Sequence, residues 1–372
     1  MARRSVALDD VSASAKRPDS SSVVSVAHAI EPIEREWDAL ADRVDASPFL
    51  RPGWISAWWT AYGRGRLEIL NIRRADGRLA GVLPLHRSGL GLISTTNAHT
   101  PEFGVLAEDS SVGGSLCQAL MERPEVRISV DGLDPNSTGA LALSSAALAA
   151  RRATLLVHRQ NSPYLSLREP DAPVGPLGRK FASDLRRRQR RLAEKGKLTF
   201  DIEDGRARLD SLLEEGLRIE GSGWKERRGT AIRSHDSTRR HYTDIARWAA
   251  LRGSLRLAFL RLDGRAVAFQ FALEDRRSYY FLKGGYATEY ARFAPGKLLV
   301  DFTMGYARST GLESFEFLGA AEPWKLEWTT SVRERILVES FATSPAGLLN
   351  LVGRKLFFAG RMAAKRVLVG VR

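Results

Sequence analysis

Residues 278–318 read SYYFLKGGYATEYARFAPGKLLVDFTMGYARSTGLESFEFL. The aromatic and apolar run at 278–286 predicts a strand, and residues 297–309 predict a helix that ends before Gly311. Residues 314–318 predict a further strand. A strand, a helix and a strand in this order form a crossover unit, in which the two strands lie parallel and the helix packs on one face. This stretch therefore predicts an α/β fold for the C-terminal half.

A pair of hairpins extends the prediction to the rest of the chain. Residues 255–273 alternate apolar and polar side chains around Asp263-Gly264, and residues 67–85 do the same around Asp76-Gly77. Asp-Gly pairs tolerate the positive φ angles of tight turns, so each stretch predicts a β-hairpin. Because the two hairpins lie about half a chain apart, we expect two similar α/β lobes, each a mixed, mostly antiparallel sheet flanked by helices.

The boundaries of the predicted parts follow from composition. Residues 1–22 are polar and lack periodicity, which indicates a disordered leader. Pro170, Pro173 and Pro176 interrupt the pattern between the lobes. We therefore expect an N-terminal lobe over 23–172, a C-terminal lobe over 173–344 and a basic amphipathic helix within 345–372.

Composition limits the possible partners. The 372 residues carry a net charge of +14, of which residues 1–175 contribute −1 and residues 176–372 contribute +15. This asymmetry predicts an anionic partner for the second half. The single Cys117 and six scattered histidines disfavour a metal site. Since there is no long apolar run and no signal-like N-terminus, we expect a cytoplasmic protein without a membrane span.

A candidate anion site lies at the start of the helix in the crossover unit. The first turn of a helix exposes N–H groups that carry partial positive charge. Pro295 presets the helical φ, and Gly296 allows close approach of a ligand. Arg292 and Lys297 add full positive charges on either side. An ordinary Pro-Gly helix start is the alternative interpretation.

The chain resembles the GNAT acyltransferases, and specifically their CelD-like, cellulose-biosynthesis branch. The tandem lobes of that branch are shared by the Fem-type aminoacyl transferases. The resemblance rests on short motifs spread over most of 180–330: Gly223-Trp224-Lys225, Gly229 to Ile232, Lys283 to Tyr286 with Tyr290, Phe293 to Leu299, Phe315 to Gly319, Trp324-Lys325 and Trp328. In the first lobe it extends to Ser47-Pro48-Phe49, Trp54, Ala57-Trp58-Trp59 and the hairpin.

The resemblance implies acetyl-CoA or another acyl-CoA as donor. The residues expected to bind it are Lys283, Gly284, Gly285, Arg292, Phe293, Pro295, Gly296 and Lys297. The family's pyrophosphate loop carries an Arg or Gln followed by two spaced glycines, whereas residues 292–297 contain only Gly296. An aminoacyl-tRNA donor, as in the Fem-type relatives, therefore stays open.

The resemblance also implies acyl transfer in the second lobe, with a first lobe that lacks an active site. Transfer needs a polarised carbonyl, a base and a proton for the leaving group. Adjacent glycines at 284 and 285 leave room for the carbonyl, and the catalytic candidates are Glu220, Tyr286, Glu316 and Lys325. The candidates for contact with the acceptor are Trp224, Lys225, Gln270, Trp324 and Trp328.

The expected acceptor is a small molecule or saccharide, such as a sugar or amino sugar of cellulose or exopolysaccharide synthesis. A catalytically silent binding protein is the third hypothesis, and it belongs to a different functional class.

Two basic helices complete the sequence picture. Nine Lys and Arg residues lie between positions 179 and 197, on a predicted amphipathic helix without the stacking aromatic side chains of a nucleic-acid binder. We therefore expect no nucleic-acid partner, except tRNA under the Fem-type alternative. The predicted helix from Ala346 to about Val369 is also basic and amphipathic. It either covers the first lobe or makes peripheral contact with an anionic membrane.

Overall fold

The computed structural model describes residues 23–168, 178–222, 229 and 231–370, with side chains described as far as Arg361. The predicted leader, the proline-rich boundary, Trp224 and Lys225 lie outside the described residues.

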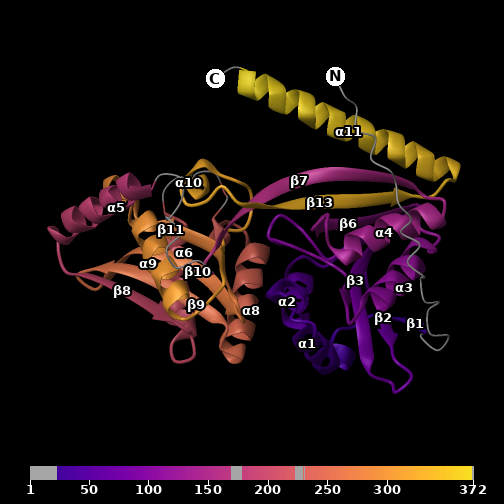
Figure 1. The fold of residues 1–372 in the computed structure, drawn as a ribbon, viewed down its shortest axis with the longest axis horizontal. Coiled ribbons are helices and arrows are strands. Elements are labelled where there is room, and N and C mark those ends of the chain that lie inside the picture. Colours follow the sequence, from indigo (N-terminus) through magenta and orange to yellow (C-terminus); the bar gives the residue numbers. More distant parts are fainter. Residues whose placement is uncertain (1–22, 169–177, 223–228, 230, 371–372) are drawn as a thin grey trace, which may run out of the picture.

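A single sheet of 13 strands runs through the described chain (Figure 1). The strands are β1 (Val24–Ala27), β2 (Arg66–Arg73), β3 (Leu79–Ser88), β4 (Gly91–Ser94), β5 (Leu106–Ala107), β6 (Arg127–Leu133), β7 (Ala153–Ser166), β8 (Leu198–Glu203), β9 (Leu255–Leu262), β10 (Arg265–Asp275), β11 (Ser278–Tyr286), β12 (Ser314–Glu316) and β13 (Val332–Phe341). Their order is β1-β2-β3-β4-β6-β13-β7-β12-β11-β10-β9-β8, and β5 pairs with β3.

Helices flank this sheet in both halves. They are α1 (Glu34–Arg43), α2 (Pro52–Tyr62), α3 (Ser110–Met121), α4 (Thr138–Ala149), α5 (Gly178–Ala193), α6 (Leu209–Glu220), α8 (Asp236–Arg252), α9 (Pro295–Ser309), α10 (Pro323–Leu326) and α11 (Pro345–Gly370). The helices predicted within 179–197 and over 297–309 are confirmed as α5 and α9.

The strand order shows that the two halves repeat one topology. From its outer edge inward, the first half runs β1-β2-β3-β4-β6 and the second half runs β8-β9-β10-β11-β12. Each half has one parallel pair, β4 with β6 and β11 with β12, and the other pairs in the described chain are antiparallel. The predicted hairpins occupy equivalent places as β2–β3 and β9–β10. The prediction of two mixed, mostly antiparallel lobes flanked by helices is confirmed.

The long strands β7 and β13 join the halves by an exchange that the sequence did not indicate. β7 follows the first half in the chain, yet its last residues pair with β12 of the second half. β13 follows the second half, yet it pairs with β6 of the first half. The two strands also pair with each other over ten residues each and form the bridge seen between the halves in Figure 1.

Apolar packing also connects the halves. One hydrophobic cluster contains the core of the first half and continues into α6, α8 and the sheet face that they cover. A second cluster lies on the opposite face, under α5 and α9. At the junction, α2 packs closely on α8, because Gly53 presents no side chain to the ring of Trp248. The fully buried Arg51 pairs with Asp275 of β10 across the same junction.

The C-terminal helix α11 starts beside β13 and runs back above β7 and β13, with its C-terminal end standing away from these strands (Figure 1). Within the described residues, no helix combines the length and the apolar character needed to traverse a bilayer.

Candidate functional site

The central feature of the candidate site is the divergence of β11 from β12. The two strands pair only from Ser278 to Tyr280, after which the chain of β12 turns away and Phe317 N–H donates to Pro163 O at 3.0 Å. β11 continues to Tyr286 with β10 as its only partner strand among the described residues. Beyond Tyr280, therefore, β12 no longer pairs with β11, and no other strand of the described chain takes its place.

A β-bulge lies in β11 just beyond the residues that pair with β12. Phe281 pairs with Ala272 and Lys283 pairs with Phe271, which leaves Leu282 as an extra residue in β11. Bulges re-aim side chains and are enriched beside active sites. Here the bulge lies at the point where the neighbouring strand departs.

The N-terminus of α9 lies beside the end of β11. Ala294 adopts left-handed angles, φ 51° and ψ 49°, and starts the helix. The amides of Lys297 and Leu298 both donate to Ala294 O, at 2.9 and 3.2 Å. A Cβ on Gly296 would lie 3.2 Å from Cδ1 of Tyr286. The helix start therefore has fewer amides available for a phosphate than its sequence suggested.

The charged side chains around this helix start have protein partners. Lys297 pairs with Glu327 and also lies over the ring of Phe181. The guanidinium of Arg292 lies 4.7 Å from the ring centroid of Phe293. These predicted donor-binding residues are thus close to one another, and the cations make contacts within the protein.

The end of α6 packs directly on β11. A Cβ on Gly285 would lie 2.6 Å from Cα of Glu220 and 2.9 Å from Ile219 O. Ser222 Oγ donates to Tyr286 O at 2.7 Å. The Glu220 carboxylate is buried and accepts a hydrogen bond from Ile232 N at 2.9 Å. The structure therefore brings the predicted residues Glu220, Gly285 and Tyr286 together.

Glu316 is held by a salt bridge at the end of β12. Its carboxylate accepts hydrogen bonds from Arg333 Nη2 at 2.8 Å and Nε at 3.1 Å, and from Ser314 Oγ at 2.9 Å. The guanidinium of Arg333 also lies 3.9 Å from the ring centroid of Tyr164. These contacts make Glu316 part of an ion pair between β12 and β13.

Lys325 supports the loop that follows β12. Its buried ammonium donates to Leu318 O at 2.8 Å and to Ala320 O at 3.1 Å, and it pairs with Glu322 at 3.1 Å. Leu318 and Gly319 both have positive φ angles, so this loop is sharply turned. The geometry gives Lys325 a role in holding the loop.

The predicted acceptor residues are spread over several environments. Trp324 is half-buried and packs edge-on against Phe281 at the open side of β11. Trp328 is fully buried against Phe181. Gln270, paired with Gly284 across the sheet, is buried and accepts a hydrogen bond from the Tyr279 hydroxyl at 3.0 Å.

An aromatic and histidine cluster at the junction of the halves was not predicted. We call this set the junction cluster: Tyr62, His99, His241, Tyr242 and Lys283. Tyr62 and His99 stack with ring centroids 5.9 Å apart and an interplanar angle of 6°. The ring of His99 meets that of Tyr242 edge-on at 5.8 Å. The ammonium of Lys283 lies 5.7 Å from the centroid of Tyr242.

The histidines of the junction cluster are held neutral. Burial, followed by the charges of Lys283 and His235, lowers the pKa of His99 to about 4. Burial also lowers the pKa of His241 to about 3, with smaller effects of His99 and Lys283 in the same direction and of the Ala57 carbonyl in the opposite one. His99 Nδ1 is buried without a hydrogen-bond partner among the described residues. A neutral imidazole with a free nitrogen can accept or donate a hydrogen bond.

The junction cluster places first-half side chains near the part of β11 that lies beyond its pairing with β12. Lys283 follows the bulge on β11, and its charge acts on His99 of the first half. The sequence offered no signal for this proximity, because His99 and His241 belong to different halves and lack any metal-type spacing.

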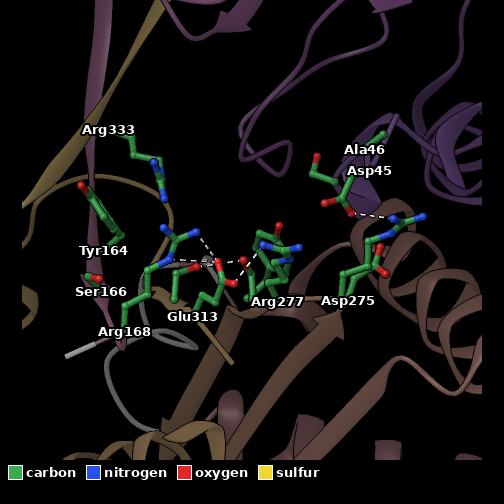
Figure 2. A pocket seen from close by; sticks show the side chains of 14 residues that line it. Asp45, Ala46, Tyr164, Ser166, Arg168, Asp275, Arg277, Glu313 and Arg333 are labelled. Carbon is green, nitrogen blue, oxygen red and sulfur yellow. Dashed lines mark hydrogen bonds and ion pairs between the residues drawn. The ribbon is translucent and has the colours of Figure 1, made fainter. Parts of the chain in front are cut away.

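A separate polar pocket opens at the other end of β11. Its volume is about 380 Å³, and both halves contribute to its walls. Figure 2 shows Glu313 between Arg168 and Arg277, with Arg333 and Tyr164 on the neighbouring wall. Ser278 lines this pocket, whereas Tyr286 lies eight residues further along the strand, roughly 25 Å away. This pocket is therefore distinct from the candidate site at Gly284 to Tyr286.

Comparison with protein families identifies the region of the chain that contains β11, α9 and β12. Residues 179–326 match the family model described as an acetyltransferase (GNAT) domain. No curated protein matches the sequence.

Solved structures share the fold of most of the chain at low sequence identity. FemX is 14% identical with a TM-score of 0.58, over 87% of this chain and 99% of that one. The C-terminal domain (DUF2156) of a putative lysylphosphatidylglycerol synthetase from Agrobacterium fabrum is 15% identical, with a TM-score of 0.55 over 85% and 94%. L-PGS from Bacillus licheniformis is 12% identical, with a TM-score of 0.51 over 82% and 96%. Residues 179–326 thus match a GNAT acetyltransferase domain, and the fold of the chain is similar to that of FemX.

Proposed function

We propose that this protein transfers an acyl group from acyl-CoA, such as acetyl-CoA, to a hydroxyl or amine of a sugar or amino-sugar acceptor. The observation that carries the proposal is the divergence of β12 from β11 after Tyr280, inside the region that matches a GNAT acetyltransferase domain. An extended, amide-containing donor arm can enter where the two strands diverge and bond to the sheet as an added strand would. The resemblance to CelD-like proteins favours an acceptor of cellulose or exopolysaccharide synthesis, and we place the reaction in the cytoplasm.

The acceptor, in this proposal, lies at the junction cluster. His99 is half-buried and its imidazole is neutral at pH 7, so the ring can accept a hydrogen bond from the attacking hydroxyl or amine. The nearby charge of Lys283 disfavours protonation of an amine, which keeps the nucleophile uncharged. Glu220 and Tyr286 remain our candidates for moving the proton, and β11 amides would stabilise the developing oxyanion.

Two predicted catalytic residues receive positioning roles in this proposal. The carboxylate of Glu316 forms a salt bridge with Arg333, and the ammonium of Lys325 donates hydrogen bonds to backbone carbonyls. We propose that Glu316 sets the separation of β12 from β11, and that Lys325 holds the loop beside Trp324. The donor-binding role of residues 292–297 stays a proposal that rests on their position at the α9 N-terminus.

Binding of acyl-CoA tests the donor assignment in this proposal. Isothermal titration of the full chain with acetyl-CoA and longer acyl-CoAs should show binding in the micromolar range, which corresponds to about −8 kcal/mol. Transfer is then followed as the release of the free thiol of CoA from acyl-CoA, which should depend on the presence of glucosamine or another monosaccharide acceptor. Absence of binding to every acyl-CoA would exclude the acyl-CoA proposal.

A matched pair of histidine variants tests the acceptor site. His99→Asn should lower kcat/KM for the acceptor by about tenfold or more, because a polar contact is lost, while acetyl-CoA affinity stays unchanged. His158→Asn is the control, since His158 lies exposed on β7 and bonds to Asn161. Equal activity of the two variants would remove His99 from the acceptor site.

Aminoacyl transfer from charged tRNA is the second candidate, and α5 favours it. This helix buries Phe181, Leu185 and Leu192 and exposes a row of arginines on its other face: Arg186, Arg187, Arg190 and Arg191. Such a face suits a phosphate backbone. Salt-sensitive binding of aminoacyl-tRNA without binding of acyl-CoA would favour this candidate, and binding of neither would favour a silent binding protein.

A further inference from the structure

The helix α11 is attached to the body along one side. Gly347 packs against the backbone of Ala342, where any Cβ would lie 1.9 Å from Ala342 O. Two turns further on, Arg354 Nε donates to the buried Glu339 of β13 at 2.8 Å. These contacts define the side of α11 that faces the body.

The opposite side of α11 exposes a stripe of large apolar residues. Leu349, Val352 and Leu356 are 75%, 53% and 68% exposed. Their spacing of three and four residues places them on one helical face, about half a turn from Gly347 and Arg354. Leu348 and Phe357 flank the stripe and are also exposed. A contiguous apolar surface of this kind marks a binding surface.

The charges of α11 all have one sign. From Pro345 to the end of the chain there is no Asp or Glu. Lys355 is exposed at the edge of the stripe, and Arg361 lies over the ring of Phe357. A second copy of α11 would bring a helix of the same charge sign alongside, whereas an anionic lipid surface complements both the cations of the helix and its apolar side chains.

We propose that α11 binds the surface of an anionic membrane, with Leu349, Val352 and Leu356 in the interfacial region and the cations near lipid phosphates. The helix lies parallel to the surface, and its attachment through Gly347 and Arg354 holds both halves of the protein at the membrane. This inference does not depend on the proposed acyl transfer.

Vesicle flotation of the full chain tests the proposal. The protein should float with vesicles of phosphatidylcholine and phosphatidylglycerol and stay unbound with phosphatidylcholine alone, and added salt should weaken binding. The triple variant Leu349→Ser, Val352→Ser, Leu356→Ser should reduce the floated fraction by about tenfold, because it removes the buried apolar surface. Equal flotation of the triple variant and the wild-type protein would overturn the proposal.

A matched control separates this stripe from exposed leucines in general. Leu141 and Leu148 of α4 are 58% and 80% exposed, and the variant Leu141→Ser, Leu148→Ser should float like the wild-type protein. Gel filtration tests the alternative, in which the stripe binds a second copy of the chain. A wild-type dimer that the triple variant converts to a monomer, together with no flotation, would assign the stripe to a second copy of the chain and overturn the membrane proposal.

Discussion

Replacement of Gly285 by Ala should push α6 away from β11 and disturb the candidate site. The added Cβ would lie 2.6 Å from Cα of Glu220, roughly 0.8 Å short of ordinary van der Waals contact. Both close neighbours are backbone atoms, which cannot rotate away as a side chain can. Gly285 lies in a strand outside the left-handed region, so the cost comes from crowding alone, and we expect a loss of about 1–3 kcal/mol of unfolding free energy.

The same change should reduce activity more than it reduces donor binding. A shift of the α6 end moves the Glu220 carboxylate and its bond to Ile232 N relative to β11. Urea denaturation measures the stability, and steady-state kinetics at a temperature where the variant is folded measures kcat.

The matched control for Gly285→Ala is Gly305→Ala in α9. No atom lies within 4 Å of its added Cβ, and Ala is the better helix former by about 1 kcal/mol. This control should be as stable as the wild-type protein or more stable, with unchanged kcat. Two results would refute the reasoning: equal stability of the two variants, or a destabilised Gly285→Ala variant with wild-type kcat.

Three further changes have expected outcomes. Lys325→Met leaves two carbonyl oxygens without their donor and should cost about 1–3 kcal/mol in urea denaturation, with a lower kcat and little change in acyl-CoA affinity. Arg333→Met should cost about 1–3 kcal/mol, because it leaves the buried Glu316 carboxylate without its cation, and wild-type stability in the same titration would contradict the ion pair. The lowered pKa values of His99 and His241 mean that only the unfolded chain takes up these protons between about pH 6.5 and pH 4, so the urea midpoint should fall as the pH drops through that window, and His99→Asn should make the fall smaller.

Local patterns predicted much of the fold. The Asp-Gly pairs at 76–77 and 263–264 identified both hairpins, because a tight turn depends on residues adjacent in the chain. The order of strand, helix and strand from β11 to β12 identified the parallel pair for the same reason. Repetition of these patterns indicated two lobes.

The candidate site was predicted only in part. Glu220, Gly285 and Tyr286 were selected from separate motifs, and they do lie together. The partners of Lys325 and Glu316 were not foreseen, since Arg333 and the loop carbonyls reach them through the exchange of β13 and a sharp turn.

Residue order along the chain thus indicated the two hairpins, the crossover unit, the duplication and the basic character of α5 and α11. Packing established the rest: the exchange of β7 and β13, the meeting of His99 with His241 and Lys283, and the outward apolar face of α11. The physical reason is the separation in sequence of the residues on which each feature depends. A turn or an amphipathic helix depends on neighbours within a few residues, whereas these contacts join distant segments whose proximity depends on how every intervening element packs.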